Sequence, residues 1–345
     1  MMTSNQPAPL NTHAAKRNSS VRSTRRGFFQ TASVAATAAA FPALSSASVR
    51  QLEKPITIGL IADLHHDVMH DGETRVDAFL QEMAETRPDA IMQLGDFAYP
   101  NAKNKAVTDK FNAAHDAALH VIGNHDTDSG HTKQQCVDIW GMSGRYYRHD
   151  VGGLRLLVLD GNDKGSPDHK GGYPSYIGKE QVEWLGEQLA ERNGPIVVVS
   201  HQPLAGYAAV DNAKPLQELL GRHAEKVALV INGHTHIDAT MNIAGVPYLH
   251  VNSASYKWVG GSHKHESYSK EIHARYRSVQ YTCPYRDSLF TTLTFDPKAG
   301  TISVKGKMSE WVGPSPKKLG INRWPGLTHG KEITPQIRAR QIELM

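Results

Sequence analysis

The stretch 56-ITIGLIADLH-65 combines an apolar run with two polar residues of the kinds that bind metals. Residues 56–62 are apolar and rich in β-branched side chains, which predicts a buried strand. Asp63 ends this run and His65 follows two residues later, so a carboxylate and an imidazole stand directly after the strand. Both side chains are common ligands of divalent transition metals.

Four later segments repeat this pattern of an apolar run followed by polar residues. Predicted strands cover residues 90–94, 119–122, 196–199 and 227–231. The motifs that follow them are Gly95-Asp96, Gly123-Asn124-His125-Asp126, Ser200-His201 and Gly233-His234-Thr235-His236. Each of these motifs is expected on a tight turn, and the glycine in three of them allows a sharp turn where a side chain would collide.

The order of the predicted elements indicates an α/β fold, in which layered β-sheets are flanked by helices. Helices are expected at residues 74–87 and 179–192, because apolar side chains recur there at helical spacing. Further strands are expected at residues 154–159, 246–251, 289–295 and 301–305. Ligands of open α/β sheets bind at the carboxyl ends of the strands, so we expect the five motifs to meet in one cleft.

The mixture of carboxylates and imidazoles in these motifs suits zinc, manganese or iron(II) better than calcium, which takes oxygen ligands almost alone. Two ions in a binuclear site lie about 3.5–4 Å apart and repel each other. A carboxylate shared by both ions offsets part of that repulsion, and Asp96, alone on its turn, is the candidate. The neutral amide oxygen of Asn124 would complete a site without adding negative charge.

Taken together and in this order, the five motifs resemble the signature of the calcineurin-like metallophosphoesterases, over roughly residues 56–251. The histidine in the first motif makes the chain similar to the branch with cyclic-nucleotide phosphodiesterases and manganese-dependent ADP-ribose or CDP-alcohol diphosphatases. The resemblance implies two divalent ions, one held by Asp63, His65, Asp96 and His236, the other by Asp96, Asn124, His201 and His234.

The resemblance further implies a hydrolase that acts on a phosphate ester or phosphoanhydride of a small substrate. A hydroxide that bridges two Mn, Fe or Zn ions would attack phosphorus, because such ions lower the pKa of bound water by several units. His125 would face the scissile phosphate and stabilise its charge or protonate the leaving oxygen, and Asp126 is expected to orient that imidazole. A phosphodiester or a nucleotide diphosphate is favoured over a phosphomonoester.

Residues 1–47 have the features of a twin-arginine signal segment. Arg25 and Arg26 precede two phenylalanines, an Ala-rich apolar stretch covers residues 32–44, and small residues follow up to Ala47. The precursor is therefore expected to use the twin-arginine export machinery, and the mature protein to be periplasmic or extracellular. No later segment is long and apolar enough for a membrane span, so none is expected in the mature form.

The formal net charge of +4 depends on this N-terminal segment. Residues 1–47 contain five basic residues and no acidic residue, whereas the remainder contains 33 basic and 34 acidic residues. Stable nucleic-acid binding is therefore not expected, which disfavours a nuclease of the same architecture. A non-catalytic metal-binding protein on this fold is the other alternative, and the retention of His125 and of every ligand position speaks against it.

The metallophosphoesterase domain is expected to cover residues 48–312, and residues 313–345 form a C-terminal tail in this interpretation. Residues 255–286 have no clear periodicity, which leaves two interpretations open: a mobile surface loop, or a loop that caps the cleft and contacts substrate. Asp128 and His131 are candidates to line the cleft, whereas Tyr256 and Trp258 could stack on a nucleobase or pack within the domain. An oxidising compartment permits a disulfide between Cys136 and Cys283, but their spacing leaves the pairing open.

Overall fold

The computed structural model describes residues 46–191 and 193–344, beginning with the short helix α1 (Ser46–Val49). All but the last two residues of the predicted signal segment, including Arg25 and Arg26, lie outside this part of the chain. Within the described residues, no helix combines the length and the apolar character that a membrane crossing requires.

Two six-stranded sheets form the centre of the fold. The first has the order β16-β13-β12-β1-β2-β3, with β1, β2 and β3 parallel. The second has the order β4-β5-β6-β7-β9-β8, with β5, β6, β7 and β9 parallel. The strands of the first sheet are β1 (Ile56–Ile61), β2 (Ala90–Gln93), β3 (Ala118–His120), β12 (Thr291–Asp296), β13 (Thr301–Val304) and β16 (Arg340–Glu343). Those of the second are β4 (Tyr147–Val151), β5 (Leu154–Leu159), β6 (Ile196–Ser200), β7 (Val227–Asn232), β8 (Ala239–Ile243) and β9 (Val246–His250).

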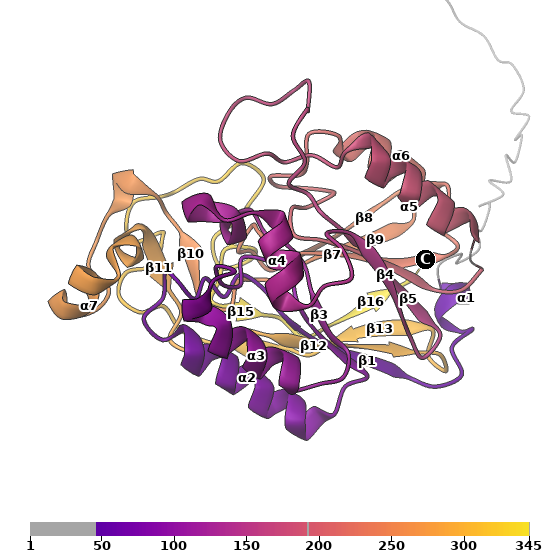
Figure 1. The fold of residues 1–345 in the computed structure, drawn as a ribbon, viewed down its shortest axis with the longest axis horizontal. Coiled ribbons are helices and arrows are strands. Elements are labelled where there is room, and N and C mark those ends of the chain that lie inside the picture. Colours follow the sequence, from indigo (N-terminus) through magenta and orange to yellow (C-terminus); the bar gives the residue numbers. More distant parts are fainter. Residues whose placement is uncertain (1–45, 192, 345) are drawn as a thin grey trace, which may run out of the picture. The chain divides into compact units, whose positions relative to one another are not determined.

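Helices cover the outer faces of both sheets, which gives four layers and confirms the predicted α/β sandwich (Figure 1). The helices α2 and α3 pack on the first sheet, and α5 and α6 pack on the second. The helices after α1 are α2 (Gly72–Thr86), α3 (Lys105–Ala113), α4 (Lys133–Trp140), α5 (Lys179–Glu191), α6 (Ala213–Gly221) and α7 (Lys270–Arg275).

Both faces of the central strands are buried, which explains why they read as continuous apolar runs. In β1, Ile58 and Leu60 point into the core between the two sheets, whereas Ile61 faces the helices α2 and α3. Strand β5 divides its side chains in the same way, with Val158 in the inter-sheet core and Leu157 beneath α5 and α6.

Residues 255–286 form a compact substructure at the edge of the two sheets. It contains the hairpin of β10 (Tyr256–Trp258) and β11 (Thr282–Pro284), helix α7, and the 3₁₀ helices η3 (Gly261–His263) and η4 (Arg277–Tyr281). Cys283 lies in β11 and Cys136 in α4, and both are buried free thiols.

The structure extends the domain beyond the boundary expected at residue 312. Strand β16 pairs with β13 as the edge strand of the first sheet, and β15 (Gln336–Ile337) pairs with β14 (Lys307–Met308). Asp238, two residues after His236, accepts hydrogen bonds from Arg338 and Arg340. The C-terminal residues are therefore part of the folded unit.

Candidate metal centre

The five polar motifs meet where the carboxyl ends of strands from both sheets come together. Asp63 and His65 follow β1, Asp96 follows β2, and Asn124 with His125 follows β3. From the second sheet, His201 follows β6, while His234 and His236 follow β7. The cleft therefore lies between the sheets at the edge that the sequence predicts.

Five of these side chains are carried by residues with left-handed backbone conformations. Asp63, His65, Asp96, His234 and His236 have φ values of 51°, 49°, 51°, 64° and 48°. Each such conformation costs a non-glycine residue roughly 1–3 kcal/mol, so it persists only where the surrounding structure enforces it. These conformations turn the side chains of three separate loops toward one point. Their concentration at one site therefore indicates a functional role.

Two of the motif glycines are required for different reasons. Gly95 has a φ of 95°, and a Cβ there would overlap His201 Nδ1, so the expected sharp turn and a close contact coincide. Gly123 has no left-handed conformation, but a Cβ at this position would collide with the Asp96 carboxylate and backbone nitrogen. Close approach of two loops, rather than a turn, therefore explains the second glycine.

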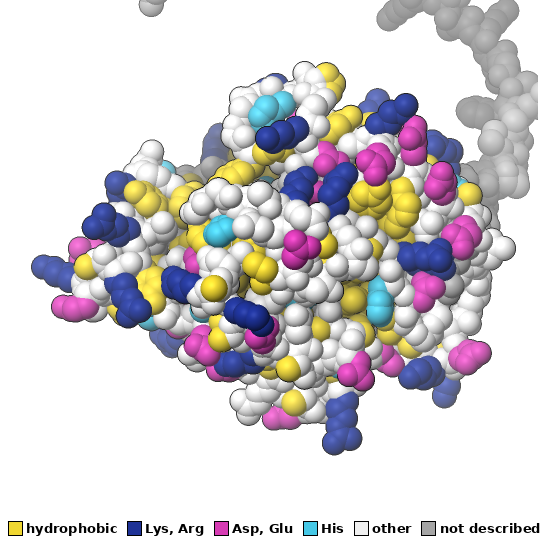
Figure 2. All heavy atoms as spheres, viewed as in Figure 1, with side chains coloured by type: hydrophobic (Ala, Val, Ile, Leu, Met, Phe, Trp, Pro, Cys, Tyr) yellow, Lys and Arg dark blue, Asp and Glu magenta, His cyan; other side chains and the backbone are white. Residues whose placement is uncertain are grey.

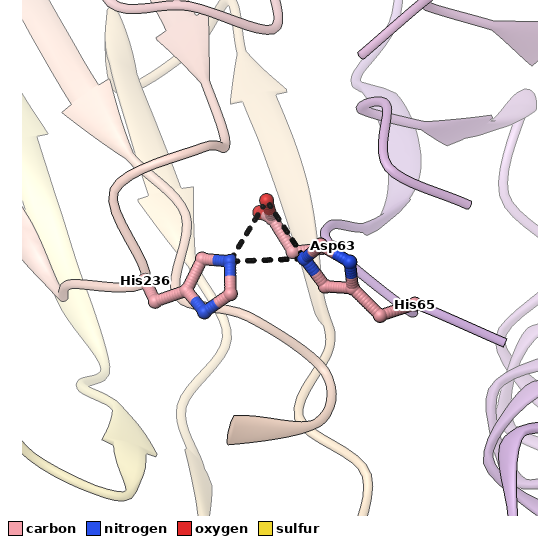
Figure 3. A group of neighbouring side chains, drawn as sticks. All are labelled: Asp63, His65 and His236. Atoms are coloured by element: carbon pink, nitrogen blue, oxygen red, sulfur yellow. Dashed lines mark hydrogen bonds and ion pairs between the residues drawn. The ribbon is translucent and has the colours of Figure 1, made fainter. Parts of the chain in front are cut away.

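The first cluster of candidate ligands consists of Asp63, His65 and His236, whose side chains point toward one another in Figure 3. His236 Nε2 lies 3.2 Å from Asp63 Oδ1 and 3.2 Å from His65 Nε2. One carboxylate oxygen and two imidazole nitrogens within 4.8 Å of one another can hold a single divalent ion.

The second cluster consists of Asp96, His201 and His234. Asp96 Oδ2 lies 3.2 Å from His201 Nε2 and 3.6 Å from His65 Nε2, so this oxygen faces both clusters. His234 Nδ1 lies 3.3 Å from His201 Nε2. The geometry thus gives two adjacent clusters with one carboxylate between them.

Backbone carbonyls set the orientation of two of the imidazoles. His201 Nδ1 donates to the Leu94 carbonyl over 2.7 Å, and His236 Nδ1 donates to the Tyr256 carbonyl over 2.7 Å. In each ring this places a proton on Nδ1 and turns Nε2 toward the cluster, so that Nε2 is the nitrogen that can bind a metal when it carries no proton.

The side-chain amide oxygen of Asn124 is available to bind a cation. This oxygen is buried and has no hydrogen-bond partner among the described residues. A buried oxygen without a partner costs about 1–3 kcal/mol. A cation beside the second cluster would satisfy this oxygen, so the donor set fits two divalent ions.

Electrostatics at the centre favour positive charge. Burial opposes ionisation of Asp96, but attraction to His201 outweighs it and holds the pKa of Asp96 well below its usual value. Burial likewise disfavours protonated His201, yet Asp96 and Asp63 raise the pKa of this imidazole to about 9. Burial lowers the pKa of His65 and of His234 to about 3, so both rings are neutral, as metal ligands must be.

The prediction that Asp126 orients His125 is wrong. The Asp126 carboxylate accepts hydrogen bonds from the backbone N–H groups of Asp96, Phe97 and Gly123, over 2.7 to 2.8 Å, and so ties together two ligand loops. Its own burial, reinforced by the charge of Asp96, raises the pKa of Asp126 well above its usual value.

The carboxylate that contacts His125 belongs to Asp128 instead. His125 Nδ1 lies 2.7 Å from Asp128 Oδ2, and the Tyr173 hydroxyl donates to both oxygens of Asp128. The backbone N–H of His125 also donates to Asp96 Oδ1 over 2.8 Å, which seats this loop against the metal centre. His131, the other candidate on this loop, contacts Asn101 and Tyr99 rather than the cleft.

The cleft lining contains more residues than the sequence predicts. The cleft encloses about 770 Å³ of empty space, part of it open to solvent. Besides the candidate ligands and His125, its lining includes Tyr173, Tyr207, Tyr256, Lys257, Trp258 and Trp324. Tyr256 stacks on His65 with 4.9 Å between ring centroids. Burial lowers the pKa of Lys257 to about 7. Of these six residues, the sequence predicts a possible role only for Tyr256 and Trp258, which are aromatic residues after a predicted strand.

Comparison with known proteins agrees with this geometry. The sequence profile of the calcineurin-like phosphoesterase family matches residues 56–238, which is just over half of the chain. No curated protein matches the chain.

Solved structures are similar to the chain at low sequence identity. A dimetal phosphatase from Danio rerio is 14% identical with a TM-score of 0.50, over 74% of this chain and 98% of its own. A purple acid phosphatase from seeds of yellow lupin (Lupinus luteus) is 15% identical with a TM-score of 0.45, over 73% of this chain and 51% of its own.

The profile match covers all five motifs, and the two ligand clusters are assembled from those motifs. The chain therefore belongs to the calcineurin-like phosphoesterase family and is a metal-dependent phosphoester hydrolase.

Proposed function

We propose that the cleft holds two divalent ions and hydrolyses a phosphodiester or a phosphoanhydride of a small molecule. Asp63, His65, Asp96 and His236 would hold one ion, and Asp96, Asn124, His201 and His234 the other. The observation that carries the proposal is that Asp96 Oδ2 lies within 3.6 Å of an imidazole nitrogen from each cluster. Manganese, iron(II) and zinc all suit this mixture of oxygen and nitrogen ligands.

When bound, the ions would supply Lewis acidity toward a phosphate oxygen and an activated water. The chain positions the remaining groups. Because the Nδ1–H of His125 donates to Asp128, Nε2 is the nitrogen available to a substrate in the cleft. From there, a protonated His125 can give its Nε2 proton to the departing oxygen or stabilise charge on the phosphate.

The size of the cleft supports a substrate with groups on both sides of phosphorus. The cleft extends from the ligand clusters to Tyr207 and Trp324, well beyond the space that one phosphate needs. A substrate with groups on both sides of phosphorus, such as a complete diester or a nucleotide diphosphate, would use this length of the cleft.

The two alternative functions find less support. On the face drawn in Figure 2, basic and acidic side chains are interspersed, which does not favour a polyanionic nucleic acid over a small substrate. A non-catalytic metal-binding role would leave the contact of His125 with Asp128 and Tyr173 without a purpose.

Assay of the full chain against a substrate panel tests the proposal. The panel would contain p-nitrophenyl phosphate, bis(p-nitrophenyl) phosphate, a cyclic nucleotide and ADP-ribose, each with manganese, iron(II) or zinc. We expect metal-dependent turnover of a diester or an anhydride, faster than that of the monoester. Absence of turnover with every metal, or turnover that persists in Asp96→Asn, would contradict the proposal.

We also propose export by the twin-arginine machinery, on the basis of Arg25, Arg26 and the apolar stretch that follows them. N-terminal sequencing of the exported protein should give a start near Ser48. Replacement of both arginines with lysine should retain the precursor inside the cell, and unchanged export of that variant would refute this localisation.

A further inference from the structure

One wall of the cleft is aromatic and is separate from the candidate ligands. Trp258 from β10, Trp324 from the C-terminal segment and Tyr207 from the loop after β6 all line the cleft. Trp258 is 44% exposed, one of three large hydrophobic side chains in the described chain that are exposed. An aromatic ring at this exposure contributes little to the core, whereas in a cleft it offers a flat surface to a ligand.

Both tryptophans lie outside the residues that match the family profile. The match ends at residue 238, while Trp258 and Trp324 come from the 255–286 substructure and from the C-terminal segment. Trp258 is supported from behind by Tyr281, with 5.6 Å between ring centroids, and β10 is anchored by the hydrogen bond from His236 to the Tyr256 carbonyl. The wall is therefore built by this chain on top of the shared metal centre.

Lys257 lies between this wall and the metal centre. Its side-chain nitrogen donates to the Thr235 carbonyl over 2.7 Å, and Thr235 stands between His234 and His236. The same nitrogen lies 5.1 Å from the ring centroid of Trp324 and 5.9 Å from that of Tyr207. An ammonium group has three donors, so two remain for an oxygen of a ligand.

The position of Lys257 decides which ligand suits the aromatic wall. Rings such as Tyr207 and Trp324 can bind either a cation or a flat uncharged group. Here the Lys257 amine already lies beside both rings, so a cationic headgroup such as choline would meet a basic nitrogen that is partly protonated near neutral pH, and its binding is disfavoured. A flat uncharged ring joined to a phosphate fits both features, because the ring can stack while the phosphate oxygen meets Lys257.

We propose that Trp258, Trp324 and Tyr207 form a subsite for a nucleobase, and that Lys257 binds a phosphate oxygen of the same nucleotide. The substrate class is then a nucleotide-containing diester or anhydride. This inference rests on the proposed phosphoesterase function, which it makes more specific.

Two substrates with one leaving group test the subsite by kinetics. Thymidine 5′-(p-nitrophenyl phosphate) and methyl p-nitrophenyl phosphate both release p-nitrophenolate and differ in whether a base is present. Base–aromatic stacking corresponds to about 5- to 150-fold in kcat/KM. We expect the wild-type chain to prefer the nucleoside diester by a factor in this range, Trp258→Ala to lose the preference, and Trp258→Phe to retain most of it.

The matched controls separate stacking from a structural effect. Met308→Ala removes an exposed side chain on β14, away from the cleft, and should change neither rate. In Trp258→Ala, turnover of the methyl diester should stay within about two-fold of wild type, as expected if the variant loses only the stacking contact. Equal losses for both diesters would mean that Trp258 only supports the fold, and would overturn the subsite.

A binding measurement distinguishes failure of the subsite from failure of the proposed function. Calorimetry with manganese would compare α,β-methylene-ADP with methylenediphosphonate, which lacks the nucleoside. The subsite would be supported if the nucleotide binds more tightly and Trp258→Ala abolishes this difference. If at the same time neither the diesters nor ADP-ribose is turned over, the phosphoesterase proposal would be refuted. Equal binding of the two compounds would overturn the subsite, whatever the activity.

Discussion

Asn124→Ala should have opposite effects on the metal-free and the metal-loaded protein. In the metal-free protein, the buried amide oxygen of Asn124 has no hydrogen-bond partner among the described residues, at a cost of about 1–3 kcal/mol. Alanine removes this oxygen and adopts the same helical backbone angles (φ −72°, ψ −35°) without strain. After allowance for lost side-chain contacts, we expect the free energy of unfolding to rise by about 1 kcal/mol, at the lower end of that range.

With metal bound, the same change removes a ligand. Binding to the native state stabilises it in proportion to the logarithm of ligand concentration over Kd, so a ten-fold loss of affinity at saturating manganese removes about 1.4 kcal/mol. The order of stability of wild type and Asn124→Ala should therefore invert between EDTA and manganese. Urea denaturation followed by circular dichroism in both buffers measures this order.

Asn112→Ala is the matched control, because the side chain of this asparagine is hydrogen-bonded to residues that do not line the cleft. Its Oδ1 lies 2.6 Å from His120 Nε2, and its Nδ2 donates a hydrogen bond to the Trp140 carbonyl. Its loss should destabilise both forms by a similar amount. The reasoning about Asn124 would be refuted if Asn124→Ala also lowered the free energy of unfolding equally in EDTA and in manganese. The amide would then be a structural group rather than a ligand.

Three further predictions concern histidines and their partners. His125→Ala should keep the metal content and lower kcat by about 10²–10⁴-fold for an alkoxide leaving group, but much less for p-nitrophenolate; equal losses would exclude a general-acid role. Asp128→Asn should lower kcat roughly ten-fold or more at unchanged metal content, because His125 loses the carboxylate that orients it; an unchanged rate would remove Asp128 from the mechanism. Burial lowers the pKa of His120 to about 3, so its contribution to stability is complete above pH 6.5 and is lost as the pH falls from 6.5 toward 3. In EDTA, His120→Gln should flatten the decline of stability across that window, and an unchanged slope would contradict this.

The central strands and the ligand motifs could be predicted because both depend on local sequence. Strand β5 has the predicted bounds, and β1 ends one residue before the predicted end, since buried parallel strands are continuous apolar runs between polar turns. The edge strand β8 was missed because it is only partly buried and is therefore not a continuous apolar run. Helix α4 was also missed, although the capping box formed by Thr132 and Gln135 marks its start.

The partners within the site could not be predicted, because they depend on the path of the loops. Asp126 is adjacent to His125 in sequence, but its side chain turns inward to the backbone of the ligand loops, and Asp128 takes the expected place. Trp324 reaches the cleft from a segment that carries no periodic signal. Strain at the ligand residues is likewise visible only in the backbone angles.

The metal content of the loaded protein tests the two-ion account most directly. Elemental analysis after saturation with manganese and removal of free metal should give two ions per chain for wild type. Asp96→Asn, which weakens the carboxylate between the clusters, should hold at most one tightly bound ion and lose turnover. A wild-type protein with one ion per chain and full activity would contradict the account.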